Sequence, residues 1–396
     1  MQDILQRAKE LSFRKINSKL PEYKRFLFDE IKNSTSKIIG IYGSRGVGKT
    51  TLILQILKEL TIDKNKILYI SLDHPIFANV NLFEFVEYFY KLGGEVVAID
   101  EVHEYKEFER DLKSIYDFLD IKVFFSGSSA LKITNPSFVR RFSMFHLPIL
   151  SLREFLEITY GIKLSNLSLS DVLNHRYVDV LSNEFKILEE FHKFLKVGNY
   201  AFYFEDKEKY QDRIIETINT ILYVDLVSVD EISPEKIDSL KKLLINICFS
   251  KPVELSMEKL AKNSGITKKS LYKYLDALNR AELINRVMNE AKRFSNIKKP
   301  DKLYLANTNL LFSLCSNPEI GNARETFFVS FIKEKYEIYF ANAGDFLVED
   351  KYVFEIGGKN KTDKQIKNLK SAFLVKDDIE IGSENIIPLW AFGFLY

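Results

Sequence analysis

The sequence has few of the residues that interrupt, cross-link or anchor a chain. It contains 2 cysteines, 9 prolines, 16 glycines and 1 tryptophan among 396 residues. No apolar run reaches the ~18 residues that a helix needs to span a bilayer, and residues 1–5 lack the pattern of a signal peptide. We therefore expect a cytoplasmic protein without a membrane partner. Cys248 and Cys315 lie far apart in apolar stretches, so we expect them to be reduced core residues.

Neither sign of charge dominates the composition. Lys and Arg number 57 and Asp and Glu number 55, which gives a net charge of +2. Composition alone therefore indicates neither a nucleic acid nor an acidic partner. Hydrophobic residues make up 46% of the chain and charged residues 28%, as in ordinary globular proteins with a substantial core. The length predicts two or three domains.

One glycine-rich stretch carries the strongest signal. Residues 43–50 fit the pattern G-x-x-x-x-G-K-[ST] of a phosphate-binding loop, between a predicted strand over 37–42 and a predicted helix over 51–58. Glycines permit left-handed backbone and close approach to a ligand, and the N–H groups of such a loop form an anion nest at a helix N-terminus. Lys49 can reach the β- and γ-phosphates, and the Thr50 hydroxyl can ligate Mg²⁺. The residues expected to hold ATP are Gly43, Ser44, Arg45, Gly46, Val47, Gly48, Lys49, Thr50 and Thr51.

A second apolar strand ends in two acids. Residues 95–99 are followed directly by Asp100 and Glu101, and the carboxyl ends of buried parallel strands are where ligands sit in open α/β sheets. We expect Asp100 to hold Mg²⁺ as part of the coordination shell of the ion. We expect Glu101 to orient and deprotonate the attacking water.

Two weaker signals follow. The strand predicted over 121–125 ends in a hydroxyl cluster, where Ser126 could sense the γ-phosphate or the water, although an ordinary Ser/Gly turn explains the pattern equally well. Arg141 could neutralise charge in the transition state. A solvated pair with Arg140 is an equal alternative.

Together these segments resemble the prokaryotic AAA-type ATPases often labelled archaeal ATPase, within the wider AAA+ and STAND-related group. The resemblance rests on residues 43–50, 100–103, 125–129, Arg141 and 147–155. It implies binding of ATP and Mg²⁺ with slow hydrolysis. It also implies a P-loop domain followed by a helical lid, a winged helix and a nuclease-like C-terminal domain, but it supplies no substrate.

Residues 100–103 also fit the D-E-x-H of some helicases. A helicase needs a second RecA-like domain, whereas this chain turns helical after the first, so we disfavour that interpretation.

We therefore expect an α/β protein in which a P-loop NTPase parallel sheet precedes three smaller parts. The expected parts are a P-loop ATPase domain over 1–150, a helical lid over 151–230, a winged helix-turn-helix over 231–312 and a nuclease-like α/β domain over 313–396.

The expected winged helix is locally basic. Residues 251–302 hold thirteen Lys and Arg against six Asp and Glu, a balance of +7, which suits a phosphate backbone. The predicted helices and hairpin cover residues 236–248, 256–266, 268–280 (capped by Thr267) and 284–305, with a basic tip over 292–299. The side of the third helix expected to face duplex DNA carries Lys268, Lys269, Ser270, Tyr272 and Lys273. Packing, or docking on a protein partner, is the alternative.

Two acids near the C-terminus could form a second metal site. A hairpin centred on Asp350 places Asp345 opposite Glu355 on one face, and Cβ atoms about 4.5–5.5 Å apart would let both carboxylates share one Mg²⁺. The nuclease pattern requires a lysine two residues after the glutamate, where this chain has Gly357. Lys359 would reach the acids only through a bulge. We therefore expect weak metal-dependent cleavage at most.

The sequence thus predicts Mg²⁺-dependent ATP binding and hydrolysis that drives movement of a C-terminal region binding DNA or another partner. Two alternatives stay open: an ATP-licensed DNA nuclease, and a STAND-type switch that holds nucleotide without steady turnover. A protein partner or a homo-oligomer is also compatible with the sequence. The rate of ATP turnover, with and without DNA, separates these functions.

Overall fold

The computed structural model describes residues 1–128, 140–182, 185–228, 232–249, 256–292, 300 and 302–396, and the chain forms two compact units, Met1–Pro148 and Ile149–Tyr396. The boundaries predicted inside the second unit stay predictions. No helix among the described residues is long and apolar enough to cross a membrane.

The first unit is built on a parallel sheet. The strands pair in the order β2-β3-β4-β1-β5, and every pairing is parallel, as the sequence predicts. The elements in chain order are α1 (Gln2–Ile16), α2 (Phe28–Asn33), β1 (Ile38–Gly43), α3 (Lys49–Glu59), β2 (Ile67–Ser71), α4 (Leu82–Lys91), β3 (Val96–Asp100), α5 (Phe108–Phe118), β4 (Lys122–Ser128) and β5 (Ser143–His146).

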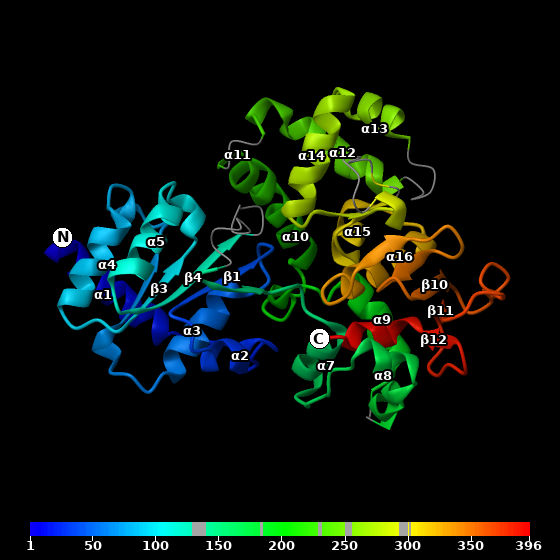
Figure 1. Ribbon diagram of the computed structural model, residues 1–396, viewed down its shortest axis with the longest axis horizontal. Helices are drawn as coiled ribbons and strands as arrows, with labels where there is room; N and C mark the ends of the chain where they lie inside the picture. Colours follow the sequence, from blue (N-terminus) through cyan, green and yellow to red (C-terminus); the bar gives the residue numbers. More distant parts are fainter. Residues whose placement is uncertain (129–139, 183–184, 229–231, 250–255, 293–299, 301) are drawn as a thin grey trace. The chain divides into compact units, whose positions relative to one another are not determined.

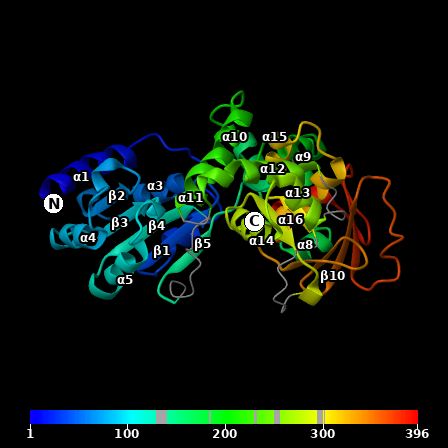
Figure 2. The ribbon, with the colours of Figure 1, turned by 90° about the horizontal axis from the view of Figure 1, so that it is seen from above.

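Helices cover both faces of this sheet. Figure 1 shows α4 and α5 on one face and α2 and α3 on the other, the arrangement that right-handed crossovers between parallel strands produce. Strand β3 is buried along its whole length, which explains its uninterrupted apolar sequence. Helix α1 lies along the edge strand β2 (Figure 2), where the buried hydroxyl of Ser12 accepts the N–H of Tyr69 at 2.9 Å. The helix thus covers an edge that would otherwise be open.

The second unit combines helices with a mixed sheet. That sheet has the order β12-β11-β10-β9-β8, and a separate antiparallel pair joins β6 to β7. The elements are α7 (Leu152–Tyr160), α8 (Leu169–Leu173), α9 (Ile187–Lys196), α10 (Tyr210–Thr220), α11 (Leu226–Ser228), α12 (Ile237–Phe249), α13 (Met257–Ser264), α14 (Lys268–Arg280), β6 (Ile284–Val287), β7 (Lys302–Leu305), α15 (Thr308–Leu314), α16 (Ile320–Ile332), β8 (Ile338–Phe340), β9 (Phe346–Val348), β10 (Tyr352–Gly357), β11 (Ala372–Lys376) and β12 (Ile386–Pro388).

The three helices and the strand pair expected for a winged helix are present as elements. Helix α14 spans the predicted residues, and the Thr267 hydroxyl caps it by accepting the N–H of Ser270 at 3.1 Å. Strands β6 and β7 pair antiparallel. The predicted basic tip falls largely on residues 293–299, which lie outside the described residues. That these elements bind DNA remains a proposal.

The predicted C-terminal hairpin has the predicted register. Phe346 pairs with Phe354 and Val348 with Tyr352, so Asp345 and Glu355 occupy the next opposed positions. Glu349, Asp350 and Lys351 connect the two strands, and Glu349 and Asp350 have φ of 55° and 51°, the left-handed conformation that tight hairpin turns use.

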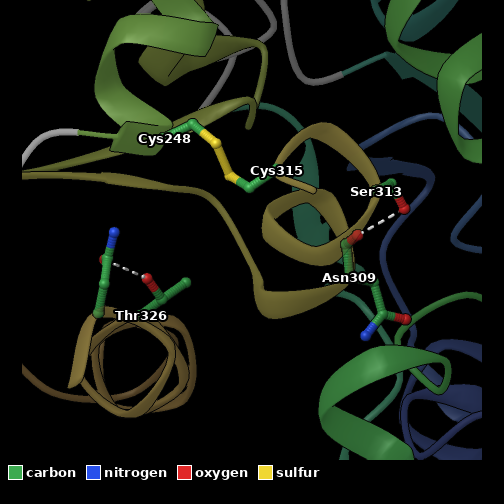
Figure 3. The surroundings of a disulfide bond; sticks show 6 residues. Cys248, Asn309, Ser313, Cys315 and Thr326 are labelled. Carbon is green, nitrogen blue, oxygen red and sulfur yellow. Dashed lines mark hydrogen bonds between the residues drawn. A yellow bond between two sulfur atoms is a disulfide. The ribbon is translucent and has the colours of Figure 1, made fainter. Parts of the chain in front are cut away.

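The two cysteines form a disulfide, so the prediction of reduced cysteines is wrong. Cys248 lies near the end of α12 and Cys315 directly follows α15, and their Cα atoms are 6.0 Å apart across a sequence separation of 67 residues (Figure 3). Both residues are buried. Their apolar surroundings were read correctly, but separation in sequence says nothing about distance once α12 and α15 pack together.

Candidate functional site

The phosphate loop connects β1 to α3 and depends on its glycines. Gly46 and Gly48 have φ of 86° and 98°, a conformation that costs energy for residues with a Cβ. A Cβ on Gly43 would lie 2.2 Å from the carbonyl oxygen of Leu147. Helix α3 begins at Lys49, two residues before the predicted start, so the lysine and Thr50 sit in the first turn, where backbone N–H groups favour anions.

Lys49 is held inside the loop. Its side chain is buried, and Nζ donates to the carbonyl oxygens of Gly43 and Ser44, each at 2.9 Å. The ammonium therefore lies among the loop groups that are expected to meet phosphate oxygens. Its contact with the phosphates of a nucleotide stays a prediction.

Arg25 supports the loop from a part of the chain that the sequence pattern does not mark. Its guanidinium is buried and donates to the carbonyl oxygen of Val47 at 2.7 Å and to that of Pro148 at 2.8 Å. It thereby joins the loop to the segment after β5. Because Arg25 precedes the phosphate-loop motif and belongs to no motif itself, the sequence carried no signal for this role.

The carboxylate of Asp100, at the end of β3, accepts hydrogen bonds from four groups. Its Oδ2 accepts from the Thr50 hydroxyl at 2.6 Å and from the Tyr69 hydroxyl at 2.7 Å, while its Oδ1 accepts from the Ser126 hydroxyl and from the N–H of Glu101. The sheet order explains the meeting, because β4 lies between β1 and β3 and β2 lies on the other side of β3. The fold therefore brings Thr50, Asp100 and Ser126 together, and their roles toward a nucleotide stay predictions.

Tyr69 is a site residue that sequence reasoning missed. Burial, and then the adjacent Asp100 carboxylate, hold the pKa of the Tyr69 phenol well above its usual value. The phenol is therefore a permanent donor to Asp100 at any working pH. A tyrosine in an apolar strand looks like an ordinary core residue, so the sequence pattern around Tyr69 did not mark it as part of a site.

The groups beside Asp100 fit a magnesium ion in type. A hydroxyl and a carboxylate are the hard oxygen donors that Mg²⁺ prefers, together with waters and substrate phosphates. Thr50 Oγ1 and Asp100 Oδ2 are already in contact at 2.6 Å. These two residues would hold the ion in the first turn of α3, next to the phosphate loop.

Glu101 occupies a strained turn directly after β3. Its φ of 52° and ψ of 47° are left-handed, a conformation that non-glycine residues adopt mainly where surrounding structure imposes it, often at functional sites. Its Oε2 lies 3.2 Å from Nδ1 of the buried His103, whose Nε2 lies 3.5 Å from Glu104. His103, noticed in the sequence only within D-E-x-H, thus lies beside the carboxylate of Glu101.

Arg141 does not reach these residues within its own unit. Its Nε lies 3.7 Å from Asp117 at the end of α5, and Ser143, two residues on, pairs with Ile39 near the start of β1. About 13 Å of strand, at roughly 3.3 Å per residue, separates Ile39 from Gly43. Arg141 therefore lies at the amino-terminal end of the strands, whereas the phosphate loop lies at their carboxyl end.

The second unit contains a buried acid centre around Glu355. Its side chain is 1% exposed, its Oε1 lies 2.5 Å from Nζ of Lys361, and its Oε2 is buried without a hydrogen-bond partner among the described residues. Burial, together with the nearby Asp345 carboxylate, raises the pKa of Glu355 despite the opposing effect of Lys361.

Lys361, which the sequence reasoning overlooked, is the lysine that contacts Glu355. The expectation that Lys359 would have to reach the acids is corrected, because Lys359 is exposed. Gly357 makes the approach possible, since a Cβ there would lie 2.4 Å from Cγ of Lys361. The signal in the sequence was the pair of glycines after Glu355, which lets the chain fold back.

Two further residues enter the acid centre from β7. Nζ of Lys302 lies 3.1 Å from Glu325 Oε2 and 3.3 Å from Asp345 Oδ1. The hydroxyl of Tyr304 also donates to Glu325 Oε2. The carboxylates are thus of the right type for a divalent cation, but an ammonium already lies between two of them.

Among the described residues, one group of histidine and acid side chains brings three potential ligand atoms close together, and it lies outside the acid centre. His192, Asp377 and Asp378 place ligand atoms within 4.8 Å of one another. Arg324 already contacts both aspartates, at 2.8 and 3.5 Å. One guanidinium therefore already offsets part of the negative charge of the two aspartates, and we assign this group no metal.

The exposed side of α14 matches the expectation for a basic face, with one exception. Lys269 and Lys273 are exposed. Lys268 is exposed too, but its Nζ lies 2.5 Å from Glu258 on α13, and this hydrogen bond lowers the pKa of Glu258 to about 2. Lys268 is therefore less available to a phosphate than the other two.

Comparison with known proteins places the first unit among AAA-type domains. Residues 35–156 match the family described as AAA domain, and residues 188–320 match a family described as a domain of unknown function (DUF8612). The AAA match includes the phosphate loop, Asp100, Glu101 and Ser126. The first unit is therefore an AAA-type P-loop domain, a fold associated with nucleotide binding.

Individual relatives add less. The chain is 28% identical over 427 residues to the uncharacterized protein MJ1637 of Methanocaldococcus jannaschii, covering 94% of this chain and 89% of that protein. The Walker-type ATPase PABY2304 of Pyrococcus abyssi is 15% identical, with a TM-score of 0.45 and coverage of 76% of this chain and 99% of that chain. AMPPCP-bound DnaA from Aquifex aeolicus is 17% identical, with a TM-score of 0.27 and coverage of 67% and 90%. At these TM-scores neither structure carries weight for this chain.

Proposed function

We propose that the first unit binds ATP with Mg²⁺ and hydrolyses it, and that turnover changes the conformation of the second unit. The observation that carries the proposal is the contact between Thr50 and Asp100 in the first turn of α3, beside the buried ammonium of Lys49. A lysine, a hydroxyl and a carboxylate are the groups that phosphate-loop chemistry uses, which supports the proposal.

The residues divide the work as follows. Lys49 and the loop N–H groups neutralise the phosphates and orient them. Thr50 and Asp100 hold Mg²⁺, which when bound draws charge from the β- and γ-phosphate oxygens. Glu101 accepts the proton of the attacking water, and His103 keeps its carboxylate in place. Ser126 and Tyr69 fix both oxygens of Asp100 and so hold the acid in one orientation.

Two substitutions separate binding from hydrolysis. Lys49→Ala should abolish ATP binding in calorimetry, because it removes the cation that meets the β/γ-phosphates. Glu101→Gln should keep binding and lower the hydrolysis rate by about 10²–10⁴-fold, since an amide cannot accept the proton. Glu107→Gln makes the same chemical change on an exposed acid six positions further on, so it should leave the rate unchanged.

The outcome also distinguishes the STAND-type alternative. Normal turnover in Glu101→Gln would remove Glu101 as the base. Tight nucleotide binding with no turnover in the unmodified protein would instead favour a switch that is opened by a partner. Stimulation by duplex DNA would support the DNA-linked functions.

A second candidate function is metal-dependent cleavage of DNA at the acid centre. The observation that favours it is the approach of Lys361 to Glu355, whose buried Oε2 has no hydrogen-bond partner in the part of the chain that the structure describes. We expect weak Mn²⁺- or Mg²⁺-dependent cleavage at most, lost in Asp345→Ala and in Glu355→Ala. Lys361→Met should also abolish it, whereas Lys359→Met, on the exposed lysine, should not. Cleavage that survives both acid substitutions would place the activity elsewhere.

We further propose that α14 contacts duplex DNA. Changing Lys268, Lys269 and Lys273 to Glu should weaken binding, and the salt dependence should fall by about one unit for each lost phosphate contact. Lys269 and Lys273 should account for most of the loss, because Lys268 is bound to Glu258. Lys209→Glu reverses an exposed charge outside this helix and controls for net charge. Unchanged affinity and salt slope would indicate a protein-docking role.

A further inference from the structure

Lys302 is an unusual residue to find inside the acid centre. Its side chain is 1% exposed, although lysines are almost never fully buried unless they are paired. Its Nζ lies within 3.3 Å of carboxylate oxygens from both Glu325 and Asp345. One ammonium therefore bridges two acids that come from different elements, α16 and the start of the β9 hairpin.

Two aromatic rings also lie beside this ammonium. It lies 4.8 Å from the ring centroid of Phe346 and 5.3 Å from that of Phe340, so the faces of both rings add cation–π attraction. Tyr304, two residues along β7 and therefore on the same face of the strand, donates to the Glu325 oxygen that Lys302 contacts. Strand β7 thus presents a matched pair of donors to the centre.

We infer that Lys302 is the resident cation of this acid centre, and that a divalent metal ion binds there only when the ammonium withdraws. The inference rests on the acid centre proposed above for cleavage, but it concerns metal binding and not catalysis. It opposes the simple expectation from a nuclease-like site, in which Asp345 and Glu355 would bind metal directly.

The oxygen atoms show why the ammonium and a metal ion exclude each other. Asp345 Oδ2 accepts the N–H of Ile356 at 2.8 Å, and its Oδ1 faces Lys302. Glu355 Oε1 faces Lys361, and Oε2 of Glu355 is buried with no hydrogen-bond partner within the described ranges. Mg²⁺ needs near-octahedral oxygen ligands at about 2.0–2.1 Å. It could gain Asp345 and Glu325 only by taking the place of the ammonium, because like charges repel strongly where water is scarce.

The test is a Mn²⁺ titration of the full-length chain, read by the electron paramagnetic resonance of free Mn²⁺. All variants carry Asp100→Asn, which removes the metal-binding acid of the first unit. Lys302→Met keeps a side chain of similar length but replaces the charged ammonium with an apolar end. A nearby charge shifts the proton affinity of a carboxylate by about 1–3 pKa units, so we expect Mn²⁺ affinity to rise at least about tenfold.

Two matched variants make the result specific. Adding Glu355→Gln to Lys302→Met should cancel the gain, because it removes the free carboxylate oxygen. Lys333→Met removes a half-buried lysine that bonds Asn285 and not the acid centre, and it should not change the affinity. Circular dichroism and melting curves confirm that each variant is folded. If Lys302→Met does not fold, Lys302→Gln keeps a polar donor without charge and should show the same gain.

Three results would overturn the inference: equal Mn²⁺ affinity in folded Lys302→Met and the parent, an equal gain in Lys333→Met, or a gain that survives Glu355→Gln. Absence of DNA cleavage in every variant would contradict the cleavage proposal alone. Cleavage by the unmodified chain with unchanged metal affinity in Lys302→Met would contradict this inference and leave the cleavage proposal standing.

Discussion

Opening the disulfide should destabilise the second unit and leave the first unit nearly unchanged. The bond joins Cys248 to Cys315 across 67 residues, and the intervening chain holds α13, α14, the β6–β7 pair and α15. Both sulfur atoms belong to buried residues. Reduction therefore removes a crosslink around most of the proposed DNA-binding module without changing any exposed group.

The expected loss is large on the scale of domain stability. In the chain-entropy treatment, a crosslink that closes a loop of this length stabilises the folded state by about 4 kcal/mol at 25 °C. With a urea m-value of about 3 kcal/mol per molar, the unfolding midpoint should fall by about 1.3 M on reduction. Substituting both cysteines by alanine should lower it slightly further, because each change also removes buried apolar volume.

The chain offers a selective reporter for this measurement. Trp390, the one tryptophan in the sequence, is buried in the second unit, so its fluorescence follows unfolding of that unit. Protein reduced and refolded differs from oxidised protein only in the crosslink, which makes it the matched control for the alanine variant. Thiol titration of oxidised protein in denaturant should give no free thiol. Two free thiols there, or equal midpoints with and without reductant, would refute the reasoning.

Two further predictions concern the first unit. Tyr69→Phe removes one hydrogen bond to a carboxylate, worth about 1.5–3 kcal/mol, so the Mg²⁺ concentration for half-maximal hydrolysis should rise by about tenfold or more, and an unchanged Mg²⁺ dependence would exclude this role. Arg141 lies at the end of the strands that is opposite to the phosphate loop. If Arg141→Ala lowers hydrolysis, the arginine must therefore serve the site of another copy. Mixing Arg141→Ala with Lys49→Ala should then restore turnover, whereas no recovery, or full activity in Arg141→Ala alone, would contradict action between copies.

The arrangement of the candidate nucleotide site was largely predictable because its residues belong to short, local sequence patterns. The loop from Gly43 to Thr50 contains its own backbone requirements, and an apolar strand that ends in acids marks Asp100 and Glu101. The parallel sheet then brings Ser126 to Asp100. Arg25 and Tyr69 were not predictable, because each acts through one side chain that arrives from a segment with no pattern of its own.

The C-terminal hairpin shows what a sequence pattern can predict and what it cannot. Period-two alternation and a short polar turn were sufficient to predict that Asp345 and Glu355 face each other. The cations around them were not predictable. Lys361 returns through a turn that a glycine permits, and Lys302 arrives from a strand assigned to a different predicted part. The disulfide has the same origin, since two helices far apart in the sequence meet only in the folded unit.

The position of Lys302 bears on how the proposed parts of the second unit could be coupled. Strand β7 pairs with β6 next to α14, and the same strand delivers Lys302 and Tyr304 to Glu325 and Asp345. A partner that displaced β7 would therefore remove the ammonium from the acid centre in the same movement. Buried carboxylates without their cation are costly to leave unpaired, so such a movement would be opposed unless a metal ion replaced the lysine. Partner binding and metal binding would then favour each other, as two ligands of one shifted state must.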